Sequence, residues 1–272
     1  EERRERRLDG EPGADDRGLP VPGTSTYTID HTSPIAERFG GWYVTGTHGE
    51  MRHLGNTIVT DSFDPEKIDP DRGANCEDLS KHFDTSAYLT PHSDMVALMV
   101  LDHQTRMHNL IARANYETRI ALYQQAQMNR ALKEPADTMR DSTRRRIENV
   151  AEPLLKYMLF IDEAALTDPV KGTSTFAADF VARGPRDSEG RSLRDFDLHR
   201  WLFQYPCSFL IYSDAWDNLP APMLDYLYSR LWTILHARDE SGVYDMLSTA
   251  DREAILTILR QTKPRLPAYW RK

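Results

Sequence analysis

The chain has 272 residues, a hydrophobic fraction of 40% and a formal net charge of −8 at pH 7. This length and composition are sufficient for one large or two small domains with a substantial core. The negative charge argues against non-specific binding to nucleic acid. No apolar run approaches the roughly 18 residues that a membrane span needs, so we expect neither a nucleic-acid partner nor a transmembrane segment.

The chain contains two cysteines, Cys76 and Cys207. Neither belongs to a C-x-x-C pair, so one long-range disulfide and two free thiols fit the sequence equally well. The first residue is Glu rather than Met, and no signal peptide is visible. We therefore expect a processed product or a fragment, which is compatible with the loss of a signal peptide.

The N-terminal third of the sequence is divided into two regions of different composition. Residues 1–23 are charged and rich in Gly and Pro, which predicts a flexible arm or linker. Residues 24–90 are predicted to form a loop-rich β meander. Its expected short strands are residues 26–30, 42–45 and 57–60, which are rich in β-branched and aromatic side chains and are separated by glycines.

The meander also concentrates side chains that are typical of ligand-binding walls. Glycines allow close backbone approach, arginines bind carboxylates in bidentate fashion, and imidazoles bind metals or relay protons. A meander whose polar side chains only tie loops together would have the same composition, and the sequence leaves both interpretations open. The candidate residues here are His31, Arg38, Trp42, His48, Arg52 and His53.

Most catalytic motifs with a defined spacing are absent. The sequence has no H-E-x-x-H, Walker loop, G-x-S-x-G or G-x-G-x-x-G, which disfavours the corresponding enzyme classes. Glu50 and His53 match E-x-x-H, the ligand pair of di-iron helix bundles. This match lies between glycines and has no second copy, so we do not expect a di-iron site.

One long helix is predicted at the centre of the chain, over residues 91–133. Residues 92–134 contain neither Gly nor Pro. Thr90 is the expected N-cap, Pro91 suits the first helical position, and Pro135 supplies the stop. An unbroken helix of this length would extend over roughly 65 Å.

Helical spacing places the polar side chains of this helix on different faces. His103 and Met107 are four residues apart and share an apolar face, whereas His108 is turned about 140° from His103. The two histidines therefore cannot bind one metal ion together in a regular helix. Each is either a buried polar group bonded to its neighbours or a ligand of a metal or cofactor.

Residues 91–272 as a whole are predicted to form a helical domain. Cap residues, apolar periodicity and Pro/Gly punctuation indicate several helices after the central one. The predicted fold class is mainly α, with the small β-rich meander near the N-terminus and residues 24–272 as one compact unit. The further helical segments are expected at residues 141–159 with a kink at Pro153, 174–183, 193–203, 208–219, 220–236 and 248–262.

Three segments carry a resemblance to a known group of proteins: HTSPIAERFGGWYVTGTHGEMRHLGN, LTPHSDMVALMVLDHQTRMHNLIARANYETR and YPCSFLIYSDAWDNLP. From about Tyr27 to Arg271 the chain resembles the C-terminal portion of large uncharacterised bacterial cytochrome c-like proteins with an upstream C-x-x-C-H haem motif. The resemblance implies an exported, redox-linked protein in the periplasm or outside the cell. This chain has no C-x-x-C-H, so haem would be bound non-covalently or be supplied by a missing upstream segment or a partner chain.

Three functions follow as hypotheses, and the sequence does not decide whether the chain is an enzyme. The first is a redox module, with electron-transfer or peroxidase-like activity and with cytochrome or redox-complex subunits as partners. The second is a non-catalytic scaffold subunit of a larger complex. The third is a metal-dependent hydrolase that uses Asp61 with histidines of the meander.

The site residues predicted for these functions overlap. Imidazole and thioether groups are the usual axial ligands of cytochrome haem, and arginines bind its propionates. The haem-site candidates are His48, His53, His103 and Met107 as ligands, with Arg38, Arg52 and Trp42 around them. The metal-ligand candidates are His31, His48, His53 and His108.

Overall fold

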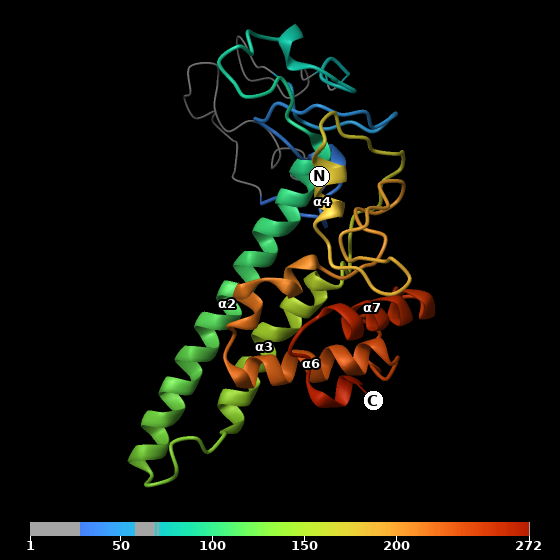
Figure 1. Ribbon diagram of the computed structural model, residues 1–272. Coiled ribbons are helices and arrows are strands. Elements are labelled where there is room, and N and C mark those ends of the chain that lie inside the picture. The colour runs from blue at the N-terminus through green and yellow to red at the C-terminus, as the bar shows by residue number, and fades with distance from the viewer. Residues whose placement is uncertain (1–27, 58–68, 70, 272) are drawn as a thin grey trace. The chain divides into compact units, whose positions relative to one another are not determined.

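The computed structural model describes residues 28–57, 69 and 71–271 (Figure 1). These residues form six α-helices and almost no strand, so the prediction of a mainly helical fold is confirmed. The predicted arm at residues 1–23 lies outside the described residues. So do parts of the predicted strands at residues 26–30 and 57–60.

The described chain divides into two compact units. Unit 1 comprises Glu1–His103, Asp162–Arg183 and Phe196–Leu202, as far as these are described. Unit 2 comprises the remaining segments, which are Gln104–Ile161, Gly184–Asp195 and Phe203–Lys272.

The β-rich meander expected near the N-terminus is not supported. Within residues 28–57 the structure has turns, the short 3-10 helix η1 (Ile35–Glu37) and isolated bridges, but no regular strand. Thr45 pairs with Asp94, and Thr47 pairs with Lys171. Positive φ angles at residues such as Gly41 interrupt the extended backbone. For this reason, the β-branched residues of this region are not sufficient to form strands.

Helix α2 (Met95–Ala131) is the long helix predicted from the sequence (Figure 1). It begins four residues later than expected, because Asp94 rather than Thr90 provides the cap. The carboxylate of Asp94 accepts hydrogen bonds from Val96 N (2.8 Å) and Ala97 N (3.2 Å). These are backbone donors of the first turn that have no partner within the helix.

Three helices form the core of unit 2. Helix α3 (Asp141–Met158) packs against α6 (Ala221–Leu235), and α6 packs against α7 (Thr249–Thr262) (Figure 1). Trp216 and Trp270 are completely buried in this unit. The predicted ranges of these helices are confirmed to within one residue at each end, and so is the cap of α7, where Ser248 and Asp251 form a reciprocal capping box. Pro153 lies inside α3, and the kink expected there stays a prediction.

Other helical predictions hold only in part. The segment expected at 174–183 is α4 (Phe176–Ala182), and the aromatic segment at 208–219 is divided between η4 (Phe209–Tyr212) and α5 (Asp214–Asp217). The short 3-10 helices η3 (Leu79–Lys81) and η5 (Ala268–Arg271) complete the helical elements of the described residues.

The helix predicted at residues 193–203 is wrong. In unit 1 the carboxylate of Asp197 accepts hydrogen bonds from His199 N (2.7 Å) and Arg200 N (2.8 Å), which fixes a turn instead. Leu198 has a positive φ of 56°. The apolar spacing of this segment was misleading, because a local aspartate competes with helical hydrogen bonding.

The two cysteines, whose bonding the sequence left open, are not joined in the structure. Both Cys76 and Cys207 are free thiols, and burial raises the pKa of Cys207 to about 12. Among the described residues, none of the helices combines the length and the apolar character required to cross a bilayer.

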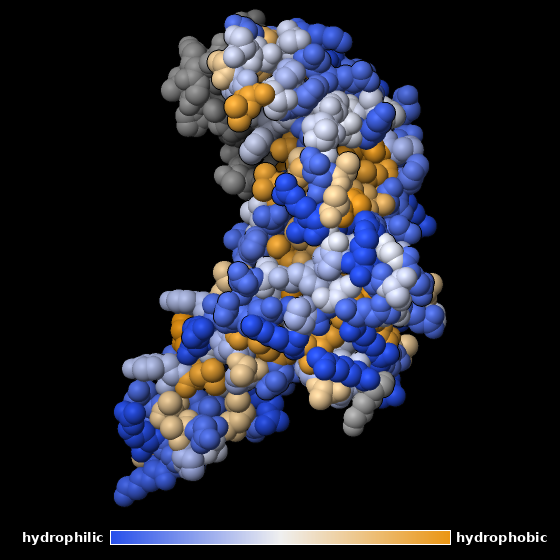
Figure 2. Space-filling view, in the orientation of Figure 1, coloured by the Kyte–Doolittle hydropathy of each residue, from blue (hydrophilic) through white to orange (hydrophobic). Residues whose placement is uncertain are grey.

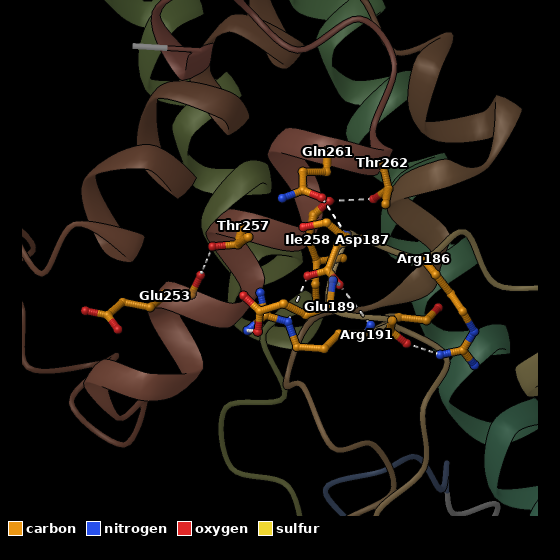
Figure 3. A network of polar contacts seen from close by, with 12 residues as sticks. Arg186, Asp187, Glu189, Arg191, Glu253, Thr257, Ile258, Gln261 and Thr262 are labelled. Carbon is orange, nitrogen blue, oxygen red and sulfur yellow. Dashed lines mark hydrogen bonds and ion pairs between the residues drawn. The ribbon is translucent and has the colours of Figure 1, made fainter.

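A loop of unit 2 is held against α7 by a compact set of polar contacts (Figure 3). The buried carboxylate of Asp187 accepts bonds from Arg191 Nε (2.8 Å), Arg191 N (2.9 Å) and Glu189 N (2.9 Å). Ser188 N donates to Gln261 Oε1 on α7 at 2.7 Å. Burial alone would raise the pKa of Asp187, but the hydrogen bonds from Arg191 and Glu189 outweigh it and lower the pKa.

We expect that Asp187→Ala lowers the free energy of unfolding by about 2 kcal/mol, because three donors lose a buried acceptor. Urea denaturation monitored by circular dichroism measures this change. Glu189→Gln is the matched control and should change stability by less than about 0.5 kcal/mol, since the Glu189 side chain is mainly exposed. Equal effects of the two substitutions would contradict the assignment.

Candidate functional site

Two histidines that are distant in the sequence meet inside unit 1. His31 precedes η1, and His103 lies in the third turn of α2. Their Nδ1 atoms are 2.9 Å apart, and their rings are stacked with centroids separated by 5.1 Å. The two side chains are 1% and 0% exposed. His31 was predicted as a metal ligand and His103 as a haem ligand, so the pair combines candidates from two different predicted sites.

Both imidazoles are neutral at neutral pH. Burial lowers the pKa of His103 to about 3. Burial, the proximity of His103 and the charge of Arg38 all lower the pKa of His31. A neutral imidazole has one N–H donor and one acceptor nitrogen, so one Nδ1 donates to the other and the two rings hold different tautomers.

Arg38 supplies a fixed positive charge beside this pair. Its side chain is buried, and it donates from Nε to Ser33 O (2.8 Å) and from Nη2 to His31 O (3.0 Å). Its Nη1 atom is 4.0 Å from Asp102 Oδ2. Because a guanidinium stays protonated, these contacts hold a permanent charge within unit 1.

Two carboxyl groups next to this charge titrate near neutrality. Burial raises the pKa of Asp102 to about 7, although the attraction of Arg38 opposes the shift. Burial likewise raises the pKa of Glu163 to about 7, against a hydrogen bond from Leu202 N (2.8 Å) and the charge of Arg38. Each group therefore changes its protonation state within the physiological pH range.

Backbone contacts bring these groups together. Ala164 N donates to His31 O at 3.0 Å, which places the Glu163 segment beside the histidine pair. Asp102 precedes His103 in α2. We call the set of five ionisable groups the buried cluster, and its members are His31, Arg38, Asp102, His103 and Glu163.

The buried cluster can bind and transfer protons. Its histidine pair contains an N–H donor facing an acceptor nitrogen, and its two carboxyl groups have pKa values of about 7. Groups with pKa values near the working pH exchange protons most effectively. Perturbed pKa values of this kind cluster at functional sites, although structural ion networks also produce them.

Two other predicted histidines, His48 and His53, form a separate pair with structural contacts. His48 donates from Nδ1 to Met51 O (2.8 Å), and its Nε2 accepts from Asn75 N (2.9 Å). His53 accepts through Nδ1 from Gly55 N (3.0 Å). The two rings lie 5.0 Å apart, centroid to centroid, at an angle of 63°. Burial lowers the pKa of both, to about 4 for His53.

This geometry does not fit coordination of haem iron by His48 or His53. A ligating imidazole needs a lone pair on one nitrogen, and it normally donates the N–H of its other nitrogen to a nearby acceptor. The Nε2 lone pair of His48 is occupied by Asn75 N–H. In His53 the acceptor nitrogen is Nδ1, which leaves the proton on Nε2.

The remaining haem-site candidates have different environments. Met107 is fully buried on α2, one turn after His103, whereas Trp42 is 56% exposed. Arg52 pairs with Asp71 at the surface. His108 is partly exposed on α2. The structure therefore brings together His31 with His103 and His48 with His53, but it does not gather the predicted haem site.

The metal-hydrolase hypothesis gains no geometric support. In the part of the chain that the structure describes, no three His, Cys, Asp or Glu side chains are grouped so that they could hold a metal ion. Asp61, its third predicted ligand, lies outside the described residues.

Asp102 and Glu163 were missed by the reasoning from sequence. An aspartate inside an apolar stretch of the central helix was a usable signal, because such a group needs a partner or a shifted pKa. No local pattern distinguishes Glu163 from other acidic residues. Comparison with protein-family models, with curated proteins and with solved structures finds no significant match for this chain.

Proposed function

We propose that this chain is a redox-associated module of a cytochrome c-like protein, and that it handles protons at the buried cluster while haem is held outside the described residues. The observation that carries the proposal is the 2.9 Å contact between the Nδ1 atoms of His31 and His103. The sequence resemblance supplies the redox context.

The physical basis is the coupling between charge and proton affinity. Adding an electron near a buried acid raises the acid's pKa, and the effect is strong where the local dielectric constant is low. Asp102 and Glu163 already have pKa values of about 7, so a small change in nearby charge is sufficient to load or release a proton. The histidine pair offers a route for that proton through a buried region.

The test is spectroelectrochemistry of the native protein. The protein is purified from its source together with any haem-bearing segment or partner that accompanies it. We expect a Soret band and a midpoint potential that falls with pH between 6 and 8. Transfer of one proton per electron corresponds to about 59 mV per pH unit. His103→Gln should flatten this slope because it breaks the imidazole pair.

His108→Gln on the same helix is the matched control and should preserve the slope, since His108 lies outside the buried cluster. Glu163→Gln provides a second variant for the case in which His103→Gln does not fold. Absence of Soret absorption in the native material would refute the redox context. A slope that both cluster variants leave unchanged would refute proton handling at this site.

The alternative to a redox module is a non-catalytic scaffold subunit, and one specific observation favours it. The rings of His48 and His53 contact backbone groups and each other, and the ring of His53 also packs against Phe39, which is typical of structural histidines. Under this alternative the buried cluster only stabilises unit 1. Native mass spectrometry that finds a stable partner without any haem would favour it.

A further inference from the structure

One face of α2 in unit 2 carries a regular row of arginines and tyrosines. Successive members are separated by three, three, four and seven residues, so helical geometry keeps them within about 120° of arc. All five side chains are exposed, and both tyrosines are 67% exposed. We call this row the Arg–Tyr stripe, and it consists of Arg113, Tyr116, Arg119, Tyr123 and Arg130.

The stripe has the composition of a protein-binding surface. Tyrosine and arginine are the residues most enriched at interface hot spots, because each combines a large contact area with directional polar groups. The three arginines extend over about 25 Å of helix. Arg119 Nε donates to Asn115 Oδ1 (2.7 Å), which keeps that guanidinium extended along the helix surface.

The charge of this region contrasts with that of the whole chain. Residues 113–146, which include the end of α2 and the start of α3, contain eight basic and four acidic residues, whereas the full chain has a net charge of −8. Among the described residues, no carboxylate forms an ion pair with Arg113, Arg119 or Arg130. Arg140 and Arg146, by contrast, pair with Glu134 and Glu117. Figure 2 shows this end of unit 2 as a hydrophilic surface interrupted by apolar residues.

We propose that the Arg–Tyr stripe docks an acidic surface of a partner protein, with carboxylates paired to the arginines and apolar side chains packed against the tyrosines. Opposite charges across an interface accelerate association and select the correct partner, and desolvated aromatic contacts supply most of the affinity. The inference is independent of the proton-handling function proposed above.

Charge and exposed apolar side chains decide between this occupant and two others. Symmetric pairing of two copies through the stripe would place arginines against arginines, which is unfavourable. Nucleic acid would also use the arginines, but its phosphates offer no partner to the exposed apolar side chains of Met128 and Leu132 at the same end of α2. An acidic protein surface satisfies both the arginines and the tyrosines.

The experiment measures binding of a fluorescein-labelled amphipathic peptide, rich in Glu with interspersed Leu and Phe, by fluorescence anisotropy with the full chain. We expect saturable binding that weakens as salt increases. Arg119→Glu/Arg130→Glu should weaken binding by about tenfold or more, because it reverses the charge of the stripe. Tyr116→Ala/Tyr123→Ala should weaken it by about tenfold at unchanged charge.

Arg144→Glu/Arg145→Glu is the matched control, because it makes the same change of charge at exposed positions of α3 outside the stripe. It should retain most of the affinity. Three outcomes would overturn the proposal: no binding of the peptide, an equal loss in the control variant, or no loss in the tyrosine variant. A DNA duplex of equal charge that binds as tightly as the peptide would also overturn it.

Discussion

Replacement of Asp94 by alanine is expected to lower the free energy of unfolding by about 3 kcal/mol, the largest effect of any single substitution considered for this chain. The side chain of Asp94 is buried in unit 1. It caps α2 through Val96 N and Ala97 N. Its other oxygen accepts from Ser174 N (2.9 Å) and Ser174 Oγ (2.6 Å).

The size of the effect follows from the number of donors that one carboxylate satisfies. Loss of an N-cap alone costs about 1 kcal/mol, and each buried donor left without a partner adds about 1 kcal/mol or more. The carboxylate also fills the space beside Gly172, where even a Cβ atom would collide with its oxygens. Truncation to alanine therefore leaves unpaired donors and a gap in the packing.

Urea denaturation of Asp94→Ala and Asp94→Asn measures the effect. Asparagine retains an oxygen that can cap α2 but replaces the other acceptor by an amide donor, so an intermediate loss is expected. Thr90→Ala is the control and should change stability by less than about 0.5 kcal/mol, since Thr90 is exposed. A larger loss for Thr90→Ala than for Asp94→Ala would restore the cap expected from sequence.

The start of α2 illustrates what the sequence could predict. The absence of Gly and Pro over residues 92–134 was sufficient to predict a long helix. Three residues near its start, Thr90, Ser93 and Asp94, are all of cap type, and local spacing does not distinguish them. The choice depends on Ser174, eighty residues away, whose two donors hold the second carboxylate oxygen of Asp94.

The candidate site shows the same dependence on long-range contacts. The sequence identified both His31 and His103 as candidate ligands, but it assigned them to different kinds of site. Their pairing across 72 residues is a tertiary contact without a local signal. His48 and His53 were predicted as haem or metal ligands, and in the structure both have specific polar contacts. Those contacts are hydrogen bonds to nearby backbone groups, which composition cannot distinguish from ligand binding.

The stability of Asp102→Asn should depend on pH differently from that of the wild-type protein. Between pH 5 and pH 9 the free energy of unfolding of this variant should rise by about 2–3 kcal/mol relative to that of the wild-type protein. Burial raises the pKa of Asp102 to about 7 in the folded protein, from an ordinary value of 3.8. Asparagine resembles the protonated aspartate at every pH and therefore lacks this titration.

The sign follows from proton linkage. Between pH 4 and 7 the folded protein holds a proton on Asp102 that the unfolded chain has already released, so the wild-type protein loses stability as pH rises through this window. His31 and His103 act in the opposite direction, because burial lowers their pKa values and the unfolded chain binds the extra protons. These histidines are present in both proteins, so their contribution largely cancels in the difference.

Chemical denaturation of both proteins across this pH range provides the measurement. Thr105→Ala, an exposed substitution in α2, is the control and should follow the wild-type profile.

The free energy of unfolding of Glu163→Gln should rise with pH in a similar way relative to the wild-type protein, because the pKa of Glu163 is also about 7. Arg38 interacts with both carboxyl groups, so the double variant should deviate from the sum of the single ones. Parallel profiles for Asp102→Asn and wild type would mean that Asp102 is ionised throughout this pH range. Asp102 would then be a fixed partner of Arg38 and would hold no exchangeable proton at neutral pH.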